Sequence, residues 1–176
     1  SYIPDELLSA FDSESMTGTW ELVLYVNQSY DITIDWSLYI IDDDSTPLDM
    51  PYVGIEYQGS QLSTSSSGIT TSEVIVNDDD FIDNFNVLIN FSSSEGLALN
   101  YLSLTLQSPY GTSVVLGAGS AITNSPYWDG GDGNTLYNTI FDDEASSSIY
   151  DGTPPFIGSY IPDELLSAFD SESMTG

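Results

Sequence analysis

The chain has 176 residues, of which 40% are hydrophobic, and it carries 28 Asp and Glu residues but no Lys, Arg or His, for a formal net charge of −28. This apolar content is typical of a globular fold, and the missing cations exclude the basic surfaces that bind nucleic acid or anionic lipid. The absence of Cys, His and Lys also excludes Ser-His-Asp, Cys-His and Schiff-base catalysis, as well as structural zinc.

Two further function classes are limited by the sequence. No apolar run reaches the ~18 residues of a transmembrane helix, so we expect no membrane span. Paired-carboxylate chemistry, as in glycoside hydrolysis, is the one catalytic class left open. Because the acidic clusters show no acid/base partner or cleft, we expect a protein that is not an enzyme.

One segment occurs twice. Residues 159–176 repeat residues 1–18 letter for letter, at an offset of 158 residues. We interpret the chain as a window from a tandem array with a 158-residue period, which is the size of one domain. The alternative is a separate subunit, in which one copy of the segment serves its own fold and the other serves a neighbour. Both interpretations predict a unit that joins to itself.

Taken in order, the chain begins with this segment, for which we predict a short helix or turn that plugs one end of a β core. Pro4 suits the first helical position, and the two acidic residues after it suit the first turn. We expect both copies to bury their apolar side chains against a sheet that bears Trp20, the second copy using the Trp of the next unit. These self-assembly side chains are Leu7, Leu8 and Phe11 in the first copy and Leu165, Leu166 and Phe169 in the second.

From residue 19 the hydrophobic period changes to two, which is the period of β-strands. Residues 20–26 and 32–40 alternate and predict a pair of strands with a heavily aromatic inner face. On the opposite face Tyr39 and Ile41 are also large, and we expect them at a lateral contact if the protein assembles side by side.

Residues 42–51 are the predicted junction, since they are acidic and contain two prolines. Further strands are predicted at 52–57, 73–77, 85–91, 99–107, 112–116 and 136–141. The Ser/Thr/Gly stretch 60–72 and the long stretch 117–134 are predicted to lack strands. Many short strands with almost no helical periodicity favour an antiparallel β-sandwich.

Several motifs resemble one known family. They are GTWEL at 18–22, DWSL at 35–38, LSLTLQSPYGT at 102–112, FDDEA at 141–145, and the stretch 152–169 that leads back to GTW. Together they resemble the P domain (P/Homo B domain) of proprotein convertases, in its bacterial form. The chain lacks the protease domain that accompanies this domain in the convertases.

The resemblance implies a jelly-roll β-sandwich, and its motif order implies where the units begin and end. That order holds only if the chain is read from about residue 44 to 176 and then onward from residue 19. We therefore assign 1–41 to the C-terminal part of one P-domain-like unit, 42–51 to the junction, and 52–176 to the N-terminal and middle part of the next unit.

The strongest chemical candidate is a calcium site. Ca²⁺ binds six to eight hard oxygen ligands, which acidic Gly-rich loops supply, and the resemblance also implies structural calcium. We expect Asp132 and Asp142 as the first ligands, with Asp129, Asp143 and Glu144 next. The alternative is a solvated acidic loop.

Asn27 and Asn90 each begin an N-glycosylation tripeptide; we expect Asn27 at a turn and Asn90 within a strand, where it is a polar edge residue. From all of this the sequence predicts an extracellular structural protein, a calcium-stabilised sandwich repeated into a filament, stalk or adhesin shaft, whose partner is itself. The alternative is a carbohydrate- or protein-binding module of a larger secreted enzyme or adhesin.

Overall fold

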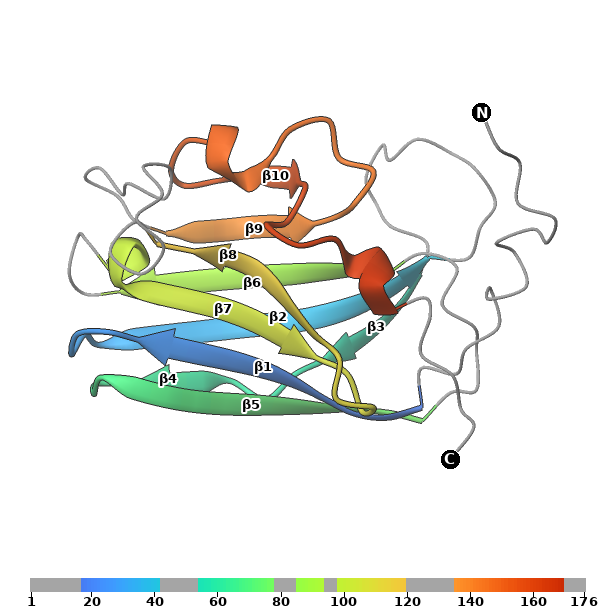
Figure 1. Cartoon of the computed structure of the whole chain (residues 1–176), viewed down its shortest axis with the longest axis horizontal. Helices are drawn as coiled ribbons and strands as arrows, with labels where there is room; N and C mark the ends of the chain where they lie inside the picture. The colour runs from blue at the N-terminus through green and yellow to red at the C-terminus, as the bar shows by residue number, and fades with distance from the viewer. Residues whose placement is uncertain (1–16, 42–53, 78–84, 94–97, 120–134, 170–176) are drawn as a thin grey trace, which may run out of the picture.

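The alternating apolar residues of the chain form strands in two facing sheets (Figure 1). The computed structural model describes residues 17–41, 54–77, 85–93, 98–119 and 135–169. All regular structure in these residues is β-strand or short 3-10 helix. The predicted all-β sandwich is therefore confirmed.

One sheet has four strands in the order β5-β1-β7-β8, and all of its pairs are antiparallel. Its strands are β1 (Gly18–Val26), β5 (Gly68–Val76), β7 (Leu102–Gln107) and β8 (Ser113–Ala118). β1 lies inside this sheet, with β5 on one side and β7 on the other.

The second sheet has the order β10-β9-β6-β2-β3, with β4 also paired to β2. Its strands are β2 (Ile32–Ile41), β3 (Gly54–Gln58), β4 (Leu62–Thr64), β6 (Phe85–Ser93), β9 (Leu136–Phe141) and β10 (Gly158–Tyr160). The pairing is antiparallel except between β10 and β9, which run parallel.

The core lies between the two sheets, where the inward faces of β1 and β2 meet. Period-two alternation places every second residue of these strands inside, as the sequence predicts. The buried side chains of the two strands are Trp20, Leu22, Leu24 and Val26 on β1 and Ile32, Ile34, Trp36 and Leu38 on β2.

The chain packs closely around the buried side chain of Trp36. Its indole N–H donates to the Ser72 hydroxyl at 2.8 Å, a buried hydrogen bond between the two sheets, and that hydroxyl in turn donates to the carbonyl of Ser60. A Cβ atom on Gly59 would lie 2.1 Å from the Trp36 ring. Position 59 therefore accepts only glycine without a shift of the ring or the backbone.

Two expectations about the strands are corrected. The predicted strand pair 20–26 and 32–40 shares one core, but β1 and β2 lie in opposite sheets and pair with other strands. The stretch 60–72 contains β4 and the first part of β5. In β5 Ser72 is buried, Thr70 is partly buried and Thr71 between them is exposed, but all three are small and polar, so hydropathy alone gives no strand signal there.

Among the described residues, three 3-10 helices accompany the strands: η2 (Ala98–Tyr101), η3 (Ile149–Asp151) and η4 (Leu166–Phe169). The first of them replaces the start of the strand predicted at 99–107. The second copy of the repeated segment forms β10 and η4, so part of it adds a strand to a sheet, whereas a helix or turn alone is predicted.

Candidate functional site

The second copy of the repeated segment connects the two sheets at one edge of the sandwich. Its first residues belong to β10, which adds to the six-stranded sheet beside β9. Further along, the backbone N–H of Asp163 donates to the Leu116 carbonyl on β8 at 3.0 Å. The backbone N–H of Glu164 donates to the Val115 carbonyl at 2.9 Å, and the Glu164 Oε2 accepts the backbone N–H of Val115 at 2.8 Å. The segment is therefore an integral part of the sandwich.

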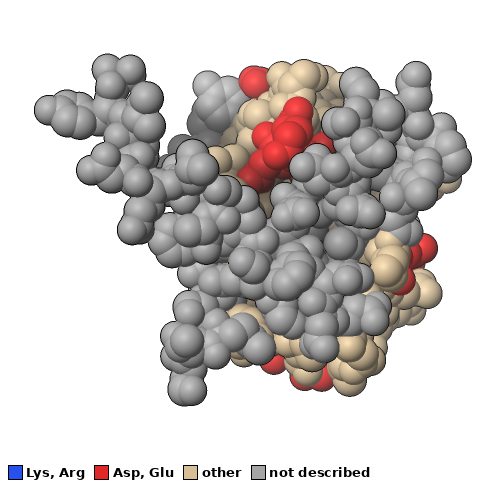
Figure 2. All heavy atoms as spheres, turned by 90° about the vertical axis from the view of Figure 1, so that its right-hand side faces the viewer, with Lys and Arg blue, Asp and Glu red and all other residues tan. Residues whose placement is uncertain are grey.

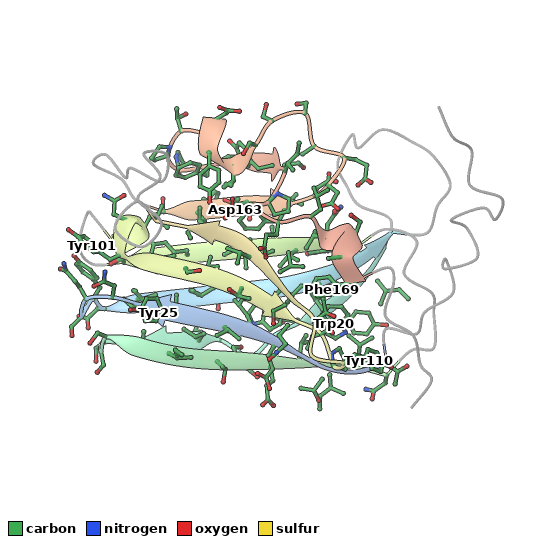
Figure 3. All side chains as sticks on the ribbon, viewed as in Figure 1. Trp20, Tyr25, Tyr101, Tyr110, Asp163 and Phe169 are labelled. Atoms are coloured by element: carbon green, nitrogen blue, oxygen red, sulfur yellow. The ribbon has the colours of Figure 1, made fainter. Side chains whose placement is uncertain are left out.

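The last residues of this copy reach the core at the start of β1. The rings of Phe169 and Trp20 lie edge to face, with centroids 5.0 Å apart and planes at 78° (Figure 3). Phe169 and Leu166 are both buried, because positions three apart lie on the same side of a 3-10 helix. The expected burial of these two side chains is confirmed, for Phe169 against Trp20, and their role in self-assembly stays a prediction.

Two details of this contact differ from the expectation. Leu165 is 52% exposed, because it lies off the side of η4 that carries Leu166 and Phe169. The Trp that Phe169 contacts belongs to the same chain, whereas we expect the Trp of a following unit. Leu7, Leu8 and Phe11 lie outside the described residues.

The strands on both sides of the predicted junction lie in the same two sheets. β1 and β2 come from residues 1–41, and they pair with strands of the 52–176 part. Within this chain, residues 17–41 therefore complete the sandwich that 54–169 form. The assignment of the two parts to successive units stays a prediction.

The acidic turn 142–144 follows β9 directly and adjoins the repeated segment. Asp142 is only 2% exposed, and its Oδ1 accepts the backbone N–H of Glu144 at 2.9 Å. Its own N–H donates to the carbonyl of Tyr160 at 3.0 Å. A buried carboxylate is thus fixed at the place where β9 meets the repeat.

Asp143 has a different role from that of its neighbour. Its Oδ1 accepts the backbone N–H of Leu166 and its Oδ2 that of Ser167, both at 2.8 Å. These are the orphan N–H groups of the first turn of η4, which a carboxylate satisfies well. The side chain expected as a calcium ligand therefore holds η4 in place.

The electrostatics of the turn are unusual because the chain has no cationic side chain. Burial raises the pKa of Glu144, and a hydrogen bond to the Asp142 carboxyl and its charge raise it further. The Glu144 and Asp142 carboxyl groups are therefore close enough to interact. On the end of the sandwich shown in Figure 2, acidic side chains form red patches without any blue Lys or Arg.

The expected calcium ligands are only partly brought together. Asp142 and Glu144 are adjacent, Asp143 is engaged with η4, and Asp129 and Asp132 lie outside the described residues. Within the described ranges, no cluster of three or more acidic side chains has metal-binding geometry.

A second carboxylate of the repeat, Asp163, contacts an aromatic side chain that the sequence did not single out. Burial raises the pKa of the Tyr150 hydroxyl to about 12, with further contributions from the charge of Asp163 and the hydrogen bond to it. Tyr150 belongs to η3, so Asp163 joins this short helix to the segment. Only the folded arrangement reveals this pair, since the two residues have no motif in common.

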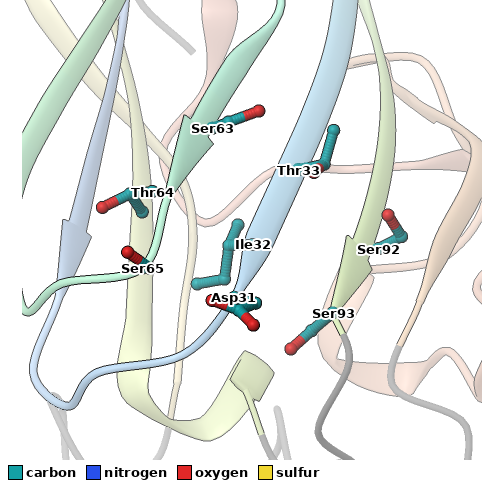
Figure 4. A pocket seen from close by; sticks show the side chains of 8 residues that line it. All are labelled: Asp31, Ile32, Thr33, Ser63, Thr64, Ser65, Ser92 and Ser93. Carbon is teal, nitrogen blue, oxygen red and sulfur yellow. The ribbon is translucent and has the colours of Figure 1, made fainter.

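A pocket of about 440 Å³ lies where β2 begins and β4 and β6 end (Figure 4). Its lining is rich in hydroxyl groups and includes one carboxylate. The residues are Asp31, Ile32, Thr33, Ser63, Thr64, Ser65, Ser92 and Ser93. Sequence reasoning missed it because Ser and Thr runs are ordinary in polar loops, and nothing in the sequence places two such runs beside Asp31.

The remaining predicted residues lie on the surface or in the sheets. Asn27 is exposed just after β1, as expected. Asn90 lies within the predicted strand, but β6 is an interior strand, and the Asn90 side chain accepts the backbone N–H of Asn138 at 2.8 Å. Tyr39 is partly buried on β2, and the Ile41 side chain is outside the described set.

The sequence also missed the exposed apolar side chains of the opposite sheet. Ile69 and Ile75 on β5 are 71% and 61% exposed, and Tyr25 lies directly across from Ile69 on β1. Ile69 was missed because stretch 60–72 was not read as a strand, so no outward face could be assigned to it, whereas Tyr25 and Ile75 lie in predicted strands whose outward faces were not examined for apolar side chains.

The described part of the chain has no helix with the length and apolar character required to cross a membrane. Comparison with protein-family models gives no match, and comparisons with curated proteins and with solved structures give none either. The resemblance to the P domain therefore remains an expectation from the sequence motifs.

Proposed function

We propose that this protein is a non-catalytic structural unit that assembles with copies of itself into an extracellular filament, stalk or adhesin shaft. One observation carries the proposal. The 159–169 part of the repeated segment is built into the sandwich through β10, η4 and the Phe169–Trp20 contact, and the same sequence occurs again at 1–18. The described sandwich has one position for this segment, whereas the chain contains its sequence twice. This favours a protein that joins to further copies.

We further propose structural calcium at the acidic turn. Asp142 and Glu144 fit as ligands, because they are adjacent oxygen donors without any basic side chain to neutralise them. Asp143 does not fit as a ligand while both of its oxygens accept backbone N–H groups. A bound Ca²⁺ would neutralise this pair at neutral pH, and millimolar calcium outside cells agrees with the proposed extracellular location.

The assembly proposal is tested by sedimentation velocity and negative-stain electron microscopy of the purified chain at fixed ionic strength. We expect elongated assemblies in calcium and smaller species after chelation. The variant Phe169→Ala should assemble less than the wild type, and Leu165→Ala, at an exposed position of the same segment, is the matched control. A chain that stays monomeric at high concentration with calcium present would refute the proposal.

The hydroxyl-rich pocket supports a second candidate, a carbohydrate-binding module. Hydroxyl groups and a carboxylate such as Asp31 form hydrogen bonds with sugar hydroxyls. A glycan array followed by calorimetry tests this function, with Asp31→Asn as the pocket variant and Asp151→Asn as a charge-matched surface control. Binding that Asp31→Asn leaves intact would place the ligand elsewhere.

A further inference from the structure

The strands β1 and β2 occupy interior positions in both sheets. β1 lies between β5 and β7, and β2 lies between β6 on one side and β3 and β4 on the other. Figure 1 shows both, in blue, running through the middle of the sandwich. Without residues 18–41, each sheet would lose an interior strand and the core would lose two rows of apolar side chains. The remaining strands therefore need β1 and β2, from the same chain or from another copy, to complete both sheets.

Two connections to the place of β1 and β2 can be compared, one that this chain makes and one that would lead from Phe169 into a further copy of β1. In this chain the strand pair is joined to the other strands through residues 42–53. The second connection starts at Phe169, whose ring contacts Trp20. Residues 170–176 have the same sequence as residues 12–18, which lead into β1. Seven extended residues span up to about 25 Å, and the ring centroids of Phe169 and Trp20 are 5.0 Å apart, so a segment of this length is long enough to connect Phe169 to a β1 strand.

Composition distinguishes the two connections. Residues 42–53 contain three consecutive Asp residues and two prolines, which is the composition of a linker between units rather than of a connection within one. Residues 170–176 instead follow directly from a buried residue that already contacts the destination. The connection through residues 170–176 therefore suits a link inside a folded unit, and residues 42–53 suit a link between units.

We infer that β1 and β2 are exchanged between copies, so that residues 17–41 of one copy complete the sandwich formed by residues 54–169 of the copy before it. The inference rests on the proposed self-assembly and names its partner, a second copy of this chain. Because each copy gives its strand pair to one neighbour and receives a pair from another, the contact is heterologous, which produces an open chain of units unless the rotation between copies closes a ring. The contacts within each sandwich are the same as those described above.

Cysteine crosslinking tests the exchange, since the chain has no cysteine of its own. Val23 on β1 lies directly opposite Thr71 on β5, on the outward face, and opposed Cβ atoms in antiparallel strands are about 4.5–5.5 Å apart. Chains carrying Val23→Cys are unfolded, mixed with chains carrying Thr71→Cys, refolded and treated with a short thiol crosslinker. We expect a covalent heterodimer on a non-reducing gel.

The matched control mixes Val23→Cys with Ile55→Cys, an exposed position on β3 of the other sheet. We expect the Thr71 mixture to give several-fold more heterodimer than this control. Equal amounts in the two mixtures, together with a purely intramolecular crosslink in the double variant Val23→Cys/Thr71→Cys, would overturn the inference. Filaments observed in that case would leave the proposed function intact, whereas heterodimers without filaments would refute the filament function and the open chain of units and would retain only the exchange of strands between copies.

A permuted chain provides a second test that requires no cysteine. It consists of residues 54–176 followed directly by residues 19–41, so that residues 170–176 connect Phe169 to the strand that bears Trp20. We expect a folded monomer with one cooperative thermal transition, because the strand pair is now supplied locally. A permuted chain that is unfolded or that self-associates as the natural chain does would contradict the inference.

Discussion

Phe169 and Leu165 belong to the same repeated segment but differ in environment, which makes them a matched pair for mutation. Phe169 is fully buried against Trp20, whereas Leu165 is largely exposed. We expect Phe169→Ala to lower the free energy of unfolding by about 3–5 kcal/mol, as for other buried aromatic side chains. Leu165→Ala should change it by about 0.5 kcal/mol or less. Urea denaturation of both variants measures the difference, and equal losses would contradict the described contact.

Glu144 offers a prediction about pH. Its pKa is raised in the folded protein by burial and by Asp142, so the folded state binds this proton more tightly than the unfolded state. The resulting stabilisation is present below the ordinary value of 4.5 and is lost as the pH rises through the raised folded pKa. In calcium-free buffer, Glu144→Gln should therefore raise the melting temperature at pH 7 and change it little at pH 4.

The control for this experiment is Asp151→Asn, which removes one exposed charge from η3. If Glu144 binds calcium, adding the ion should stabilise Glu144→Gln less than it stabilises the wild type. A Glu144→Gln variant that behaves like Asp151→Asn at every pH and calcium concentration would show that the carboxyl pair has no energetic effect.

Among the strands, β1 and β5 place two like charges directly opposite each other. Glu21 faces Glu73 in the antiparallel register, and such pairs are destabilising. We expect Glu73→Gln to relieve the repulsion and Glu73→Lys to add an attraction, with a total gain of about 0.2–1 kcal/mol for the lysine variant. The gain should shrink in high salt because salt screens surface charges. Thermal unfolding at low and high salt measures it, and a gain that salt leaves unchanged would exclude this electrostatic origin.

The strands also show how much of the fold can be predicted from the sequence. Alternation of large apolar residues located β1, β2 and β7, because burial of one sheet face requires that period. Alternation says which face is buried but not which strand is adjacent, so it could not separate β1 and β2 into opposite sheets. The start of β5 was missed because Thr70, Thr71 and Ser72 alternate in position without alternating in hydropathy.

The candidate site was less predictable for a related reason. Clustered carboxylates indicated a cation, and Asp142 and Glu144 are indeed adjacent. The role of Asp143 depends on the N–H groups of Leu166 and Ser167, more than twenty residues away along the chain. No local motif indicates that Asp143 has such a partner, so the sequence does not distinguish an Asp that caps a helix from an Asp that binds a metal here.

For the whole molecule, the charge of −28 predicts a dependence on calcium. Ligand at a hundred times its dissociation constant stabilises a folded state by about 2.7 kcal/mol, which corresponds to roughly 5–10 °C in a domain of this size. We expect the melting temperature to fall by this amount when a chelator replaces calcium at constant ionic strength. Magnesium at the same concentration is the control for general screening, and an unchanged melting temperature would exclude a structural calcium site.

The position of β1 between β5 and β7 has a consequence for synthesis on the ribosome. Both neighbours are made after β1, and roughly 80 residues separate its end from the end of β7, which takes roughly 4–16 s at ordinary elongation rates. If β1 waits for the strands of its own copy, Trp20 and Leu22 remain in water for that interval, when nascent chains are prone to aggregate. If it instead completes the preceding copy, the neighbouring strands have already been synthesised when it emerges, and the exposed interval becomes shorter.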